Sequence, residues 1–440
     1  MKKRINCPAI LLAAALLFSG CSMRTVDEMY VLPKRSEDYS NLQSVMDEAM
    51  VGLEFSAPLS GDNQQSVQMA DVDGDGEQEY LVFTKGSSAL PLRILVFDRQ
   101  DDIFVHADTI ESNGTAFDQV EYIQMDDMPG VEVVVGRQVS DQLVRSVSVY
   151  TFATGEGEQL VTANYRKFVT VDMDENGRSE LFVLRPGHAE TDNGIAELYS
   201  MEKGIMERSN EVSMSGPADR LKRILVGKLS DKKMAVYVAS AVEDTLLITD
   251  VYTKTGERLT NVSLSNESGI SVQTLRNYYV YADDMDDDGV VELPRLVTMI
   301  PLDSSPSSDQ SELILWYALG SDGTVENKLY TYYDATGGWY LELDENLIPR
   351  ITVKRQANVF EFYLWSEDYS VAQRLMTIYT LTGQNREEQS VADGRFVLLK
   401  TDTVTYAASL DAAAANYQIT QQSLIRSFCL IHRDWNSGEM

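Results

Sequence analysis

Short runs of β-branched and aromatic residues, separated by turn-rich stretches at regular spacing, fill the chain from about residue 65 onwards. Residues 80–84, 131–135, 146–152 and 359–365 are clear examples. Runs of this length and composition predict short antiparallel strands. Many such strands in one chain indicate an all-β fold, which could be a sandwich, a barrel or a propeller.

A unit of about 50 residues recurs in this region and favours the propeller. Each unit has an apolar strand, an acidic loop, a second apolar strand and two further strands. The acidic loops fall near residues 71, 126, 172, 230, 284 and 344, and a weaker seventh copy covers residues 394–410. We therefore expect about seven four-stranded blades over residues 60–412, with six as the alternative. A strand from the N-terminal region should complete the last blade, because that closes the ring and removes exposed sheet edges.

Helices are expected on both sides of this region. A helix is predicted over residues 40–58, with Ser40 and Gln43 as a capping box and apolar residues on one face that packs on the domain. Residues 413–440 are predicted to form a helical cap that begins at Thr420 as N-cap and is followed by Trp435.

The first twenty residues form a separate unit. Lys2-Lys3-Arg4 precedes a short apolar run over residues 10–18, and Ser19-Gly20-Cys21 follows directly. This order resembles a bacterial lipobox, which implies a signal peptide over residues 1–20 and a lipidated tether over residues 21–39. Cys21 would carry the diacylglyceryl anchor and hold the protein on the extracytoplasmic face of the cell membrane. The alternative is an uncleaved membrane anchor, but the run is too short to span a bilayer comfortably.

The charge and the cysteines narrow the possibilities further. The chain has 37 basic and 68 acidic residues and a net charge of −31. Binding to a phosphate backbone depends on clustered Lys and Arg, so we expect no nucleic-acid partner. After removal of the signal peptide only Cys21 and Cys429 remain, and with Cys21 lipidated no internal disulfide can stabilise the domain.

Three of the acidic loops share one pattern of nine positions. Acidic or amide residues stand at positions 1, 3 and 5, glycine at position 6 and glutamate at position 9. Calcium takes six to eight oxygen ligands, and a tight turn with carboxylates on alternate residues brings such oxygens to one point. Position 7 would contribute its backbone carbonyl. The expected ligands are Asp71, Asp73, Asp75, Glu77 and Glu79; Asp172, Asp174, Asn176, Arg178 and Glu180; and Asp284, Asp286, Asp288, Val290 and Glu292, with Glu77, Arg178 and Val290 acting through the carbonyl.

This pattern is flanked by predicted strands. It resembles the FG-GAP or VCBS repeats of integrin-type β-propellers. Their calcium loops join the first two strands of a blade, and the resemblance covers residues 60–410. The order of lipobox, helix, first repeat at QMADVDGDGEQEYLVF and closing helix also resembles a group of Firmicute surface lipoproteins. The resemblance implies a calcium-binding propeller in which the ions are structural.

The other acidic loops depart from the pattern. Residues 126–132 look shortened and contain proline, Asp231 is followed by two lysines, and no glycine follows Asp344-Glu345-Asn346. We therefore expect about three calcium sites, on alternate blades, and ordinary turns elsewhere. Pro294, just inside the strand after the third site, predicts an irregular blade there.

The remaining chemistry favours binding over catalysis. His106, His188 and His432 form no zinc-ligand pair, and the chain has no GxSxG elbow and no phosphate-binding glycine loop. Aromatic residues concentrate between residues 316 and 365, where core packing is the first interpretation and a stacking platform for sugar or protein the second. We expect a cell-surface binding or scaffold module for a protein or glycan, and not an enzyme. The alternative is an extracellular polysaccharide hydrolase or lyase with a carboxylate site in the central pit.

Overall fold

The structure, a computed structural model, describes residues 37–139, 144–188, 193–244, 246–277, 280–302 and 312–431. The signal peptide, Cys21, most of the tether, His432 and Trp435 lie outside these residues. The expected all-β class is confirmed, because the described residues form six antiparallel sheets of four or five strands. None of these sheets closes on itself.

The first three sheets are built from strands that follow one another in the chain. Sheet 1 contains β1 (Glu54–Phe55), β2 (Val67–Ala70), β3 (Glu79–Lys85), β4 (Leu92–Gln100) and β5 (Ile103–Ser112). Sheet 2 contains β6 (Ala116–Ile123), β7 (Glu132–Gln138), β8 (Arg145–Thr151) and β9 (Glu158–Tyr165). Sheet 3 contains β10 (Lys167–Val171), β11 (Glu180–Arg185), β12 (Ile195–Glu202) and β13 (Ile205–Ser213).

Sheet 4 keeps this simple order and contains β14 (Leu221–Lys228), β15 (Met234–Ala241), β16 (Leu247–Thr255) and β17 (Arg258–Asn261). The last two sheets depart from it. Sheet 5 contains β18 (Leu293–Thr298), β19 (Glu312–Leu319), β20 (Val325–Asp334), β21 (Trp339–Leu343) and, from the C-terminal region, β27 (Phe428–Leu430). Sheet 6 contains β22 (Ile351–Gln356), β23 (Val359–Trp365), β24 (Ala372–Thr382), β25 (Phe396–Lys400) and β26 (Val404–Leu410).

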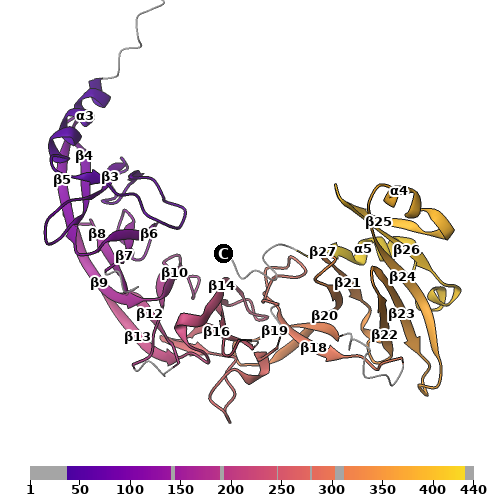
Figure 1. Cartoon of the computed structure of the whole chain (residues 1–440). Coiled ribbons are helices and arrows are strands. Elements are labelled where there is room, and N and C mark those ends of the chain that lie inside the picture. Colours follow the sequence, from indigo (N-terminus) through magenta and orange to yellow (C-terminus); the bar gives the residue numbers. More distant parts are fainter. Residues whose placement is uncertain are drawn as a thin grey trace, which may run out of the picture.

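The sheets pack face to face in chain order and form an open arc (Figure 1). Early strands such as β6 and β10 line the inside of the arc, and late strands such as β9 and β13 lie on the outside. Central strands such as β7 and β15 are buried along almost their whole length, because a neighbouring sheet covers each face. The outer strands β9 and β13 keep many exposed residues.

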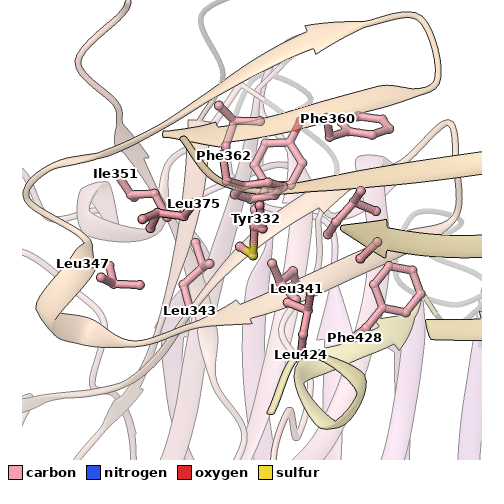
Figure 2. Packing of buried hydrophobic residues seen from close by; sticks show 14 of the residues in the cluster. Tyr332, Leu341, Leu343, Leu347, Ile351, Phe360, Phe362, Leu375, Leu424 and Phe428 are labelled. Atoms are coloured by element: carbon pink, nitrogen blue, oxygen red, sulfur yellow. The ribbon is translucent and has the colours of Figure 1, made fainter. Parts of the chain in front are cut away.

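Separate hydrophobic clusters join neighbouring sheets. Sheets 1 and 2, 2 and 3, 3 and 4, 4 and 5, and 5 and 6 each share one. At the junction of sheets 5 and 6, Tyr332 and Leu341 face Phe360 and Phe362 (Figure 2). Because burial of apolar surface is the main favourable term in folding, each junction stabilises its own pair of sheets.

The ring expected from the sequence is not closed within the described residues. No hydrophobic cluster contains residues of both sheet 1 and sheet 6, and the two ends of the arc lie apart in Figure 1. The described strand β1 does not close the ring, because it pairs with β3 inside sheet 1, and residues 1–36, from which a closing strand could also come, lie outside the described residues.

The expectation of seven blades is wrong, and the alternative of six agrees with the number of sheets. The weak seventh copy forms β25 and β26, and these strands extend sheet 6 because β26 pairs with β24 from Met376 to Thr382. Residues 394–410 therefore form part of sheet 6 and not a sheet of their own.

The expected N-terminal helix is present, but it begins earlier. Helix α3 (Glu37–Ala49) places Ser40 inside the helix, so Ser40 is not its N-cap. Leu42 is buried against Val82 and Phe97 on the face of sheet 1 that points away from sheet 2. The helix therefore covers the first sheet at the start of the arc.

The C-terminal helix begins where the sequence predicts and ends sooner. Thr420 caps α5 (Gln421–Ser427) in a reciprocal capping box with Ser423, which confirms the predicted N-cap. After Ser427 the chain continues as β27, which pairs with β21. The remaining short helices are α4 (Arg386–Gln389), η1 (Ala218–Arg220), η2 (Val272–Thr274), η3 (Glu345–Leu347), η4 (Ala392–Gly394) and η5 (Ala412–Tyr417). Among the helices of the described residues, none has the length and apolar character needed to span a membrane.

Trp339 tests the junction of sheets 5 and 6. Its side chain is 0% exposed, and its ring centroid lies 4.9 Å from that of Phe360 and 5.2 Å from that of Phe428. Trp339→Ala should lower the free energy of unfolding by about 3–5 kcal/mol, since it removes a large buried ring. Urea denaturation followed by circular dichroism measures this loss. Tyr369→Ala, at a residue that is 44% exposed, should change stability by no more than about 0.5 kcal/mol, and equal losses in both variants would contradict the packing described here.

Candidate metal centres

Four of the sheets contain a nine-residue hairpin with the same register. The residue before position 1 pairs with position 9 in each: Ala70 with Glu79 in sheet 1, Ile123 with Glu132 in sheet 2, Val171 with Glu180 in sheet 3 and Asp283 with Glu292 in sheet 5. We call these the hairpins of sheets 1, 2, 3 and 5. The three predicted calcium loops are thus structurally equivalent and belong to alternate sheets of the arc.

The side chains at positions 1, 5 and 9 fold each of the three predicted loops in the same way. The carboxylate at position 1 accepts a hydrogen bond from the glycine amide at position 6, at 3.2, 2.8 and 2.8 Å in sheets 1, 3 and 5. The side chain at position 5 accepts from the amide at position 7, at 2.7, 2.8 and 2.7 Å. The position-9 carboxylate accepts from the amide at position 2. The side chains at positions 1, 5 and 9 are therefore turned towards the backbone of their own loop.

Two positions of the loop adopt left-handed backbone. Position 6 has φ of 92°, 87° and 81° at Gly76, Gly177 and Gly289, which explains why glycine recurs there. Position 4 is also left-handed, at Gly74, Glu175 and Asp287, although only one of these residues is glycine. Gly74 is needed for a different reason, because a Cβ on it would lie 2.3 Å from the carbonyl carbon of Pro129 in the neighbouring hairpin.

The hairpins bring together the acidic residues at positions 1, 3 and 9. One ligand oxygen from each residue lies within 4.8 Å of the others in the groups Asp71, Asp73 and Glu79; Asp172, Asp174 and Glu180; and Asp284, Asp286 and Glu292. Asp75, at position 5 of the loop in sheet 1, belongs to a further group that is described below. Asn176 and Asp288 occupy position 5 in the other two loops. At position 7, the amides of Glu77, Arg178 and Val290 hold the position-5 side chains.

The hairpin of sheet 1 gathers a carboxylate that the sequence analysis missed. Asp98, near the end of β4, lies within 4.8 Å of Asp73 and Asp75. The strand register accounts for this position. Tyr80 of β3 pairs with Phe97 of β4, so Asp98, the next residue of β4, lies opposite Glu79. Asp98 itself accepts hydrogen bonds from the backbone amide of Arg99 and from Gln100 Nε2, the latter at 3.2 Å. Burial, followed by the nearby aspartates, raises the pKa of Glu79 to about 7.

The hairpin of sheet 5 is similar but has lysines at its margin. Lys328 Nζ lies 3.4 Å and Lys232 Nζ 3.7 Å from Asp288 Oδ2, at position 5. Burial again comes first among the causes that raise the pKa of Glu292 to about 7. The expected irregularity at Pro294 is confirmed, because residues before the loop form only an isolated bridge from Asp283 to Glu292. In a strand, every second residue directs its backbone amide to the same side, so Pro294 would be the next donor after Glu292. Proline has no amide hydrogen, and the ladder therefore stops at this bridge.

The hairpin of sheet 3 contains a lysine from the next sheet. Lys254 Nζ, in β16, lies 2.7 Å from Asp174 Oδ2 and 2.7 Å from Glu180 Oε1. The side chains of Lys254 and Glu180 are only 7% and 4% exposed. Burial disfavours the charged ammonium, but the hydrogen bonds to both carboxylates raise the pKa of Lys254 overall. Lys254 was not singled out in the sequence, because it lies 74 residues from Glu180.

The structure of the hairpin of sheet 2 corrects one prediction made from the sequence. It is not shortened: it begins at Gln124 and has the same length as the others. It lacks a cluster because positions 1 and 5 carry Gln124 and Met128, and Glu132 is left as its closing acid.

The acidic loops near residues 230 and 344 are turns, as expected. Asp231 accepts a hydrogen bond from the Ser321 hydroxyl, and Asp344 caps η3.

A divalent cation fits the hairpins of sheets 1 and 5. Glu79 and Glu292 are 2% and 0% exposed, and Oε1 of each is buried without a hydrogen-bond partner. A cation between positions 1, 3 and 9 would supply that partner and neutralise the carboxylates. The donors are oxygen atoms only, which suits hard cations such as Ca²⁺ or Mg²⁺. In sheet 3 the corresponding oxygen, Glu180 Oε1, already has Lys254 as its partner.

Comparisons with known proteins identify no family. No protein-family model matches the chain, and no curated protein matches it. Among solved structures it is similar to exotype rhamnogalacturonan lyase YesX, with 11% identity and a TM-score of 0.25 over 74% of this chain and 68% of the other. It is also similar to Bacillus licheniformis rhamnogalacturonan lyase PL11, with 11% identity and a TM-score of 0.30 over 69% and 73%. For rhamnogalacturonan lyase YesW the values are 11% and 0.27 over 74% of each chain.

These matches contradict our expectation that the protein is not an enzyme, because all three structures are lyases, and we withdraw it. At these TM-scores the similarity assigns no activity and no residue roles to this chain.

The contact between the first two hairpins gives a prediction on two glycines of one loop. Both have positive φ, but a Cβ on Gly76 meets nothing within 4 Å, whereas one on Gly74 collides with Pro129. Gly76→Ala should destabilise the protein by about 1–2 kcal/mol, the cost of a left-handed residue with a side chain. Gly74→Ala should cost about 1–3 kcal/mol more, since the hairpins of sheets 1 and 2 must move apart. Urea unfolding of both variants measures the difference, and indistinguishable losses would show that the contact is unimportant.

Proposed function

We propose that the protein is a lipoprotein on the extracytoplasmic face of the membrane whose calcium-stabilised, propeller-type arc binds a neutral glycan. The exposed face of sheet 6 would carry the binding site. The observation that carries this proposal is that aromatic and hydrogen-bonding side chains lie together on a sheet face on which, among the described residues, no other sheet packs.

The sheet arrangement supports the propeller-type interpretation. Sheets of consecutive antiparallel strands that pack face to face around a common inner side are the repeating unit of a propeller. In the described part of this chain the ring is open, so the last sheet keeps a face that a closed ring would cover.

Strand β23 shows this face most clearly. Phe360, Phe362 and Leu364 are buried, and the residues between them, including Tyr363 and Trp365, are partly exposed. The strand thus has one core face and one face open to solvent. Trp365 Nε1 donates to the carbonyl oxygen of Ile300 at 3.3 Å, and this bond orients its ring.

Charged groups surround these rings. Tyr363 donates to Glu361 Oε2 at 3.2 Å, and Arg374 Nη1 lies 2.7 Å from Glu361 Oε1. The centre of a protein–protein interface is depleted of charged residues, whereas sugar recognition combines stacking on rings with hydrogen bonds to hydroxyl groups. A glycan therefore fits this face better than a protein. The net charge of −31 disfavours an acidic polymer, and a neutral glycan remains.

Calcium is the cation we propose for the acidic hairpins. Extracytoplasmic proteins meet calcium at about 1 mM, and sites of this kind bind it with Kd near 0.1 mM. Each occupied site would then stabilise the fold by about 1.4 kcal/mol through mass action. This matters in a domain for which we expect no disulfide.

Chelation tests the calcium proposal. EDTA should lower the melting temperature by several degrees, because the carboxylates of the hairpins then repel one another without a cation. Asp73→Ala should lose part of that sensitivity, since Asp73 belongs to both clusters of sheet 1. Differential scanning calorimetry with and without calcium measures both effects. An identical melting curve in EDTA would remove calcium from the proposal.

A glycan array tests the binding face. Trp365→Ala and Tyr363→Ala should each weaken binding of a neutral oligosaccharide about tenfold or more, as loss of an aromatic anchor does. Tyr417→Ala, which removes a ring that is 36% exposed on η5, is the matched control and should bind normally. Binding of peptides but not glycans would contradict the proposal. Release of reducing ends from a bound polysaccharide would show that the same protein also cleaves its ligand.

A further inference from the structure

We propose that Lys254 takes the place of a divalent cation in the hairpin of sheet 3, so that the chain binds two structural cations, in sheets 1 and 5, and not three. The inference rests on the cation sites of the proposed function. It concerns three loops that the sequence pattern makes equivalent.

The contacts of Lys254 are those expected of a cation in this loop. Its ammonium lies 2.7 Å from Asp174 Oδ2 at position 3 and 2.7 Å from Glu180 Oε1 at position 9. In sheets 1 and 5 the same oxygen of the position-9 glutamate, in Glu79 and Glu292, is buried without a partner. One oxygen is therefore satisfied by a lysine in one hairpin and left for a cation in the other two.

The register explains why the position-9 glutamate of this hairpin receives a lysine and that of sheet 1 does not. In sheet 4, Tyr252 pairs with Val236, and Lys254 stands two residues after Tyr252. In sheet 2, Tyr150 pairs with Val133 in the corresponding way, and Phe152 stands two residues after Tyr150. Phe152 is buried in the cluster that joins sheets 1 and 2. The neighbouring sheet thus provides an ammonium group to the hairpin of sheet 3 and an uncharged ring next to sheet 1.

The chain is also built differently at the junction of sheets 3 and 4. The hairpin of sheet 4 is one residue shorter, because Gly227 pairs with Ala235. Its residue Lys228 forms a second link to sheet 3, with Nζ 2.7 Å from Glu175 Oε1. Two lysines of sheet 4 therefore bind the acidic loop of sheet 3. A divalent ion entering this loop would meet the buried ammonium of Lys254, and that repulsion excludes it.

Calcium stoichiometry of the full chain, measured by isothermal titration calorimetry after removal of bound metal, tests the inference. The wild type should bind two ions. Lys254→Met should bind three, because it frees Asp174 and Glu180 as ligands and opens the loop to a cation. Lys228→Met is the matched control: it removes a lysine that contacts Glu175, at a position that is not a ligand, and should leave the number at two.

A second pair of variants decides the matter if Lys254→Met does not fold. Glu180→Gln should leave the wild-type stoichiometry of two unchanged, whereas Glu79→Gln should lower it to one. Three ions in the wild type, with one lost in Glu180→Gln, would overturn the role of Lys254 and leave the calcium proposal intact. A folded Lys254→Met variant that still binds two ions would also overturn it. No calcium bound by the wild type would instead contradict the calcium part of the proposed function.

Discussion

Main-chain hydrogen bonds between neighbouring hairpins are the constraint on which the arrangement of the sheets depends. The carbonyl at position 1 of one hairpin accepts from the amide at position 8 of the next: Asp71 from Val131 at 3.1 Å, and Gln124 from Ser179 at 2.8 Å. Lys228 accepts from Val291 in the same way, at 3.0 Å. Apolar contacts between sheets are non-directional, so these bonds fix how the sheets are placed on each other at the junctions of sheets 1 and 2, 2 and 3, and 4 and 5. They also explain why the hairpin of sheet 2 keeps the length of the others, although it has no acidic cluster and its left-handed residue is Gly130 at position 7.

In sheets 1, 3 and 5, one backbone conformation serves loops of different charge. In sheet 1 the loop gathers carboxylates alone, with Asp98 added from β4, and in sheet 5 lysines touch only the margin at Asp288. In sheet 3 the charge is balanced by Lys254 within the protein. At the junction of sheets 3 and 4 these side-chain links hold the two sheets where the hairpin of sheet 4 is shorter. Under the proposed function, dependence on a cation is therefore concentrated in sheets 1 and 5, while lysine links the sheets at the centre of the arc.

The sequence predicts what is encoded locally and misses what depends on partners distant in the chain. The strands, the three acidic loops and the Thr420 N-cap follow from periodicity and turn residues, and the structure agrees. Asp98 and Lys254 could not be assigned from spacing, because strand register and sheet packing bring them to the loops. The blade count failed for a similar reason. Residues 394–410 have the composition of a new unit, but pairing of β26 with β24 makes them part of sheet 6.

The two ends of the arc differ in a way that bears on binding. At sheet 1, helix α3 covers the outer face with Leu42 and neighbouring apolar residues, as an exposed apolar face requires. At sheet 6, the outer face of β23 carries Glu361, Tyr363 and Trp365, which mix ring and hydrogen-bonding surface. A face of this composition is soluble without a cover. The same mixture suits a ligand made of sugar rings and hydroxyl groups, which is why we propose the binding surface at this end of the arc, where it does not expose the hydrophobic core.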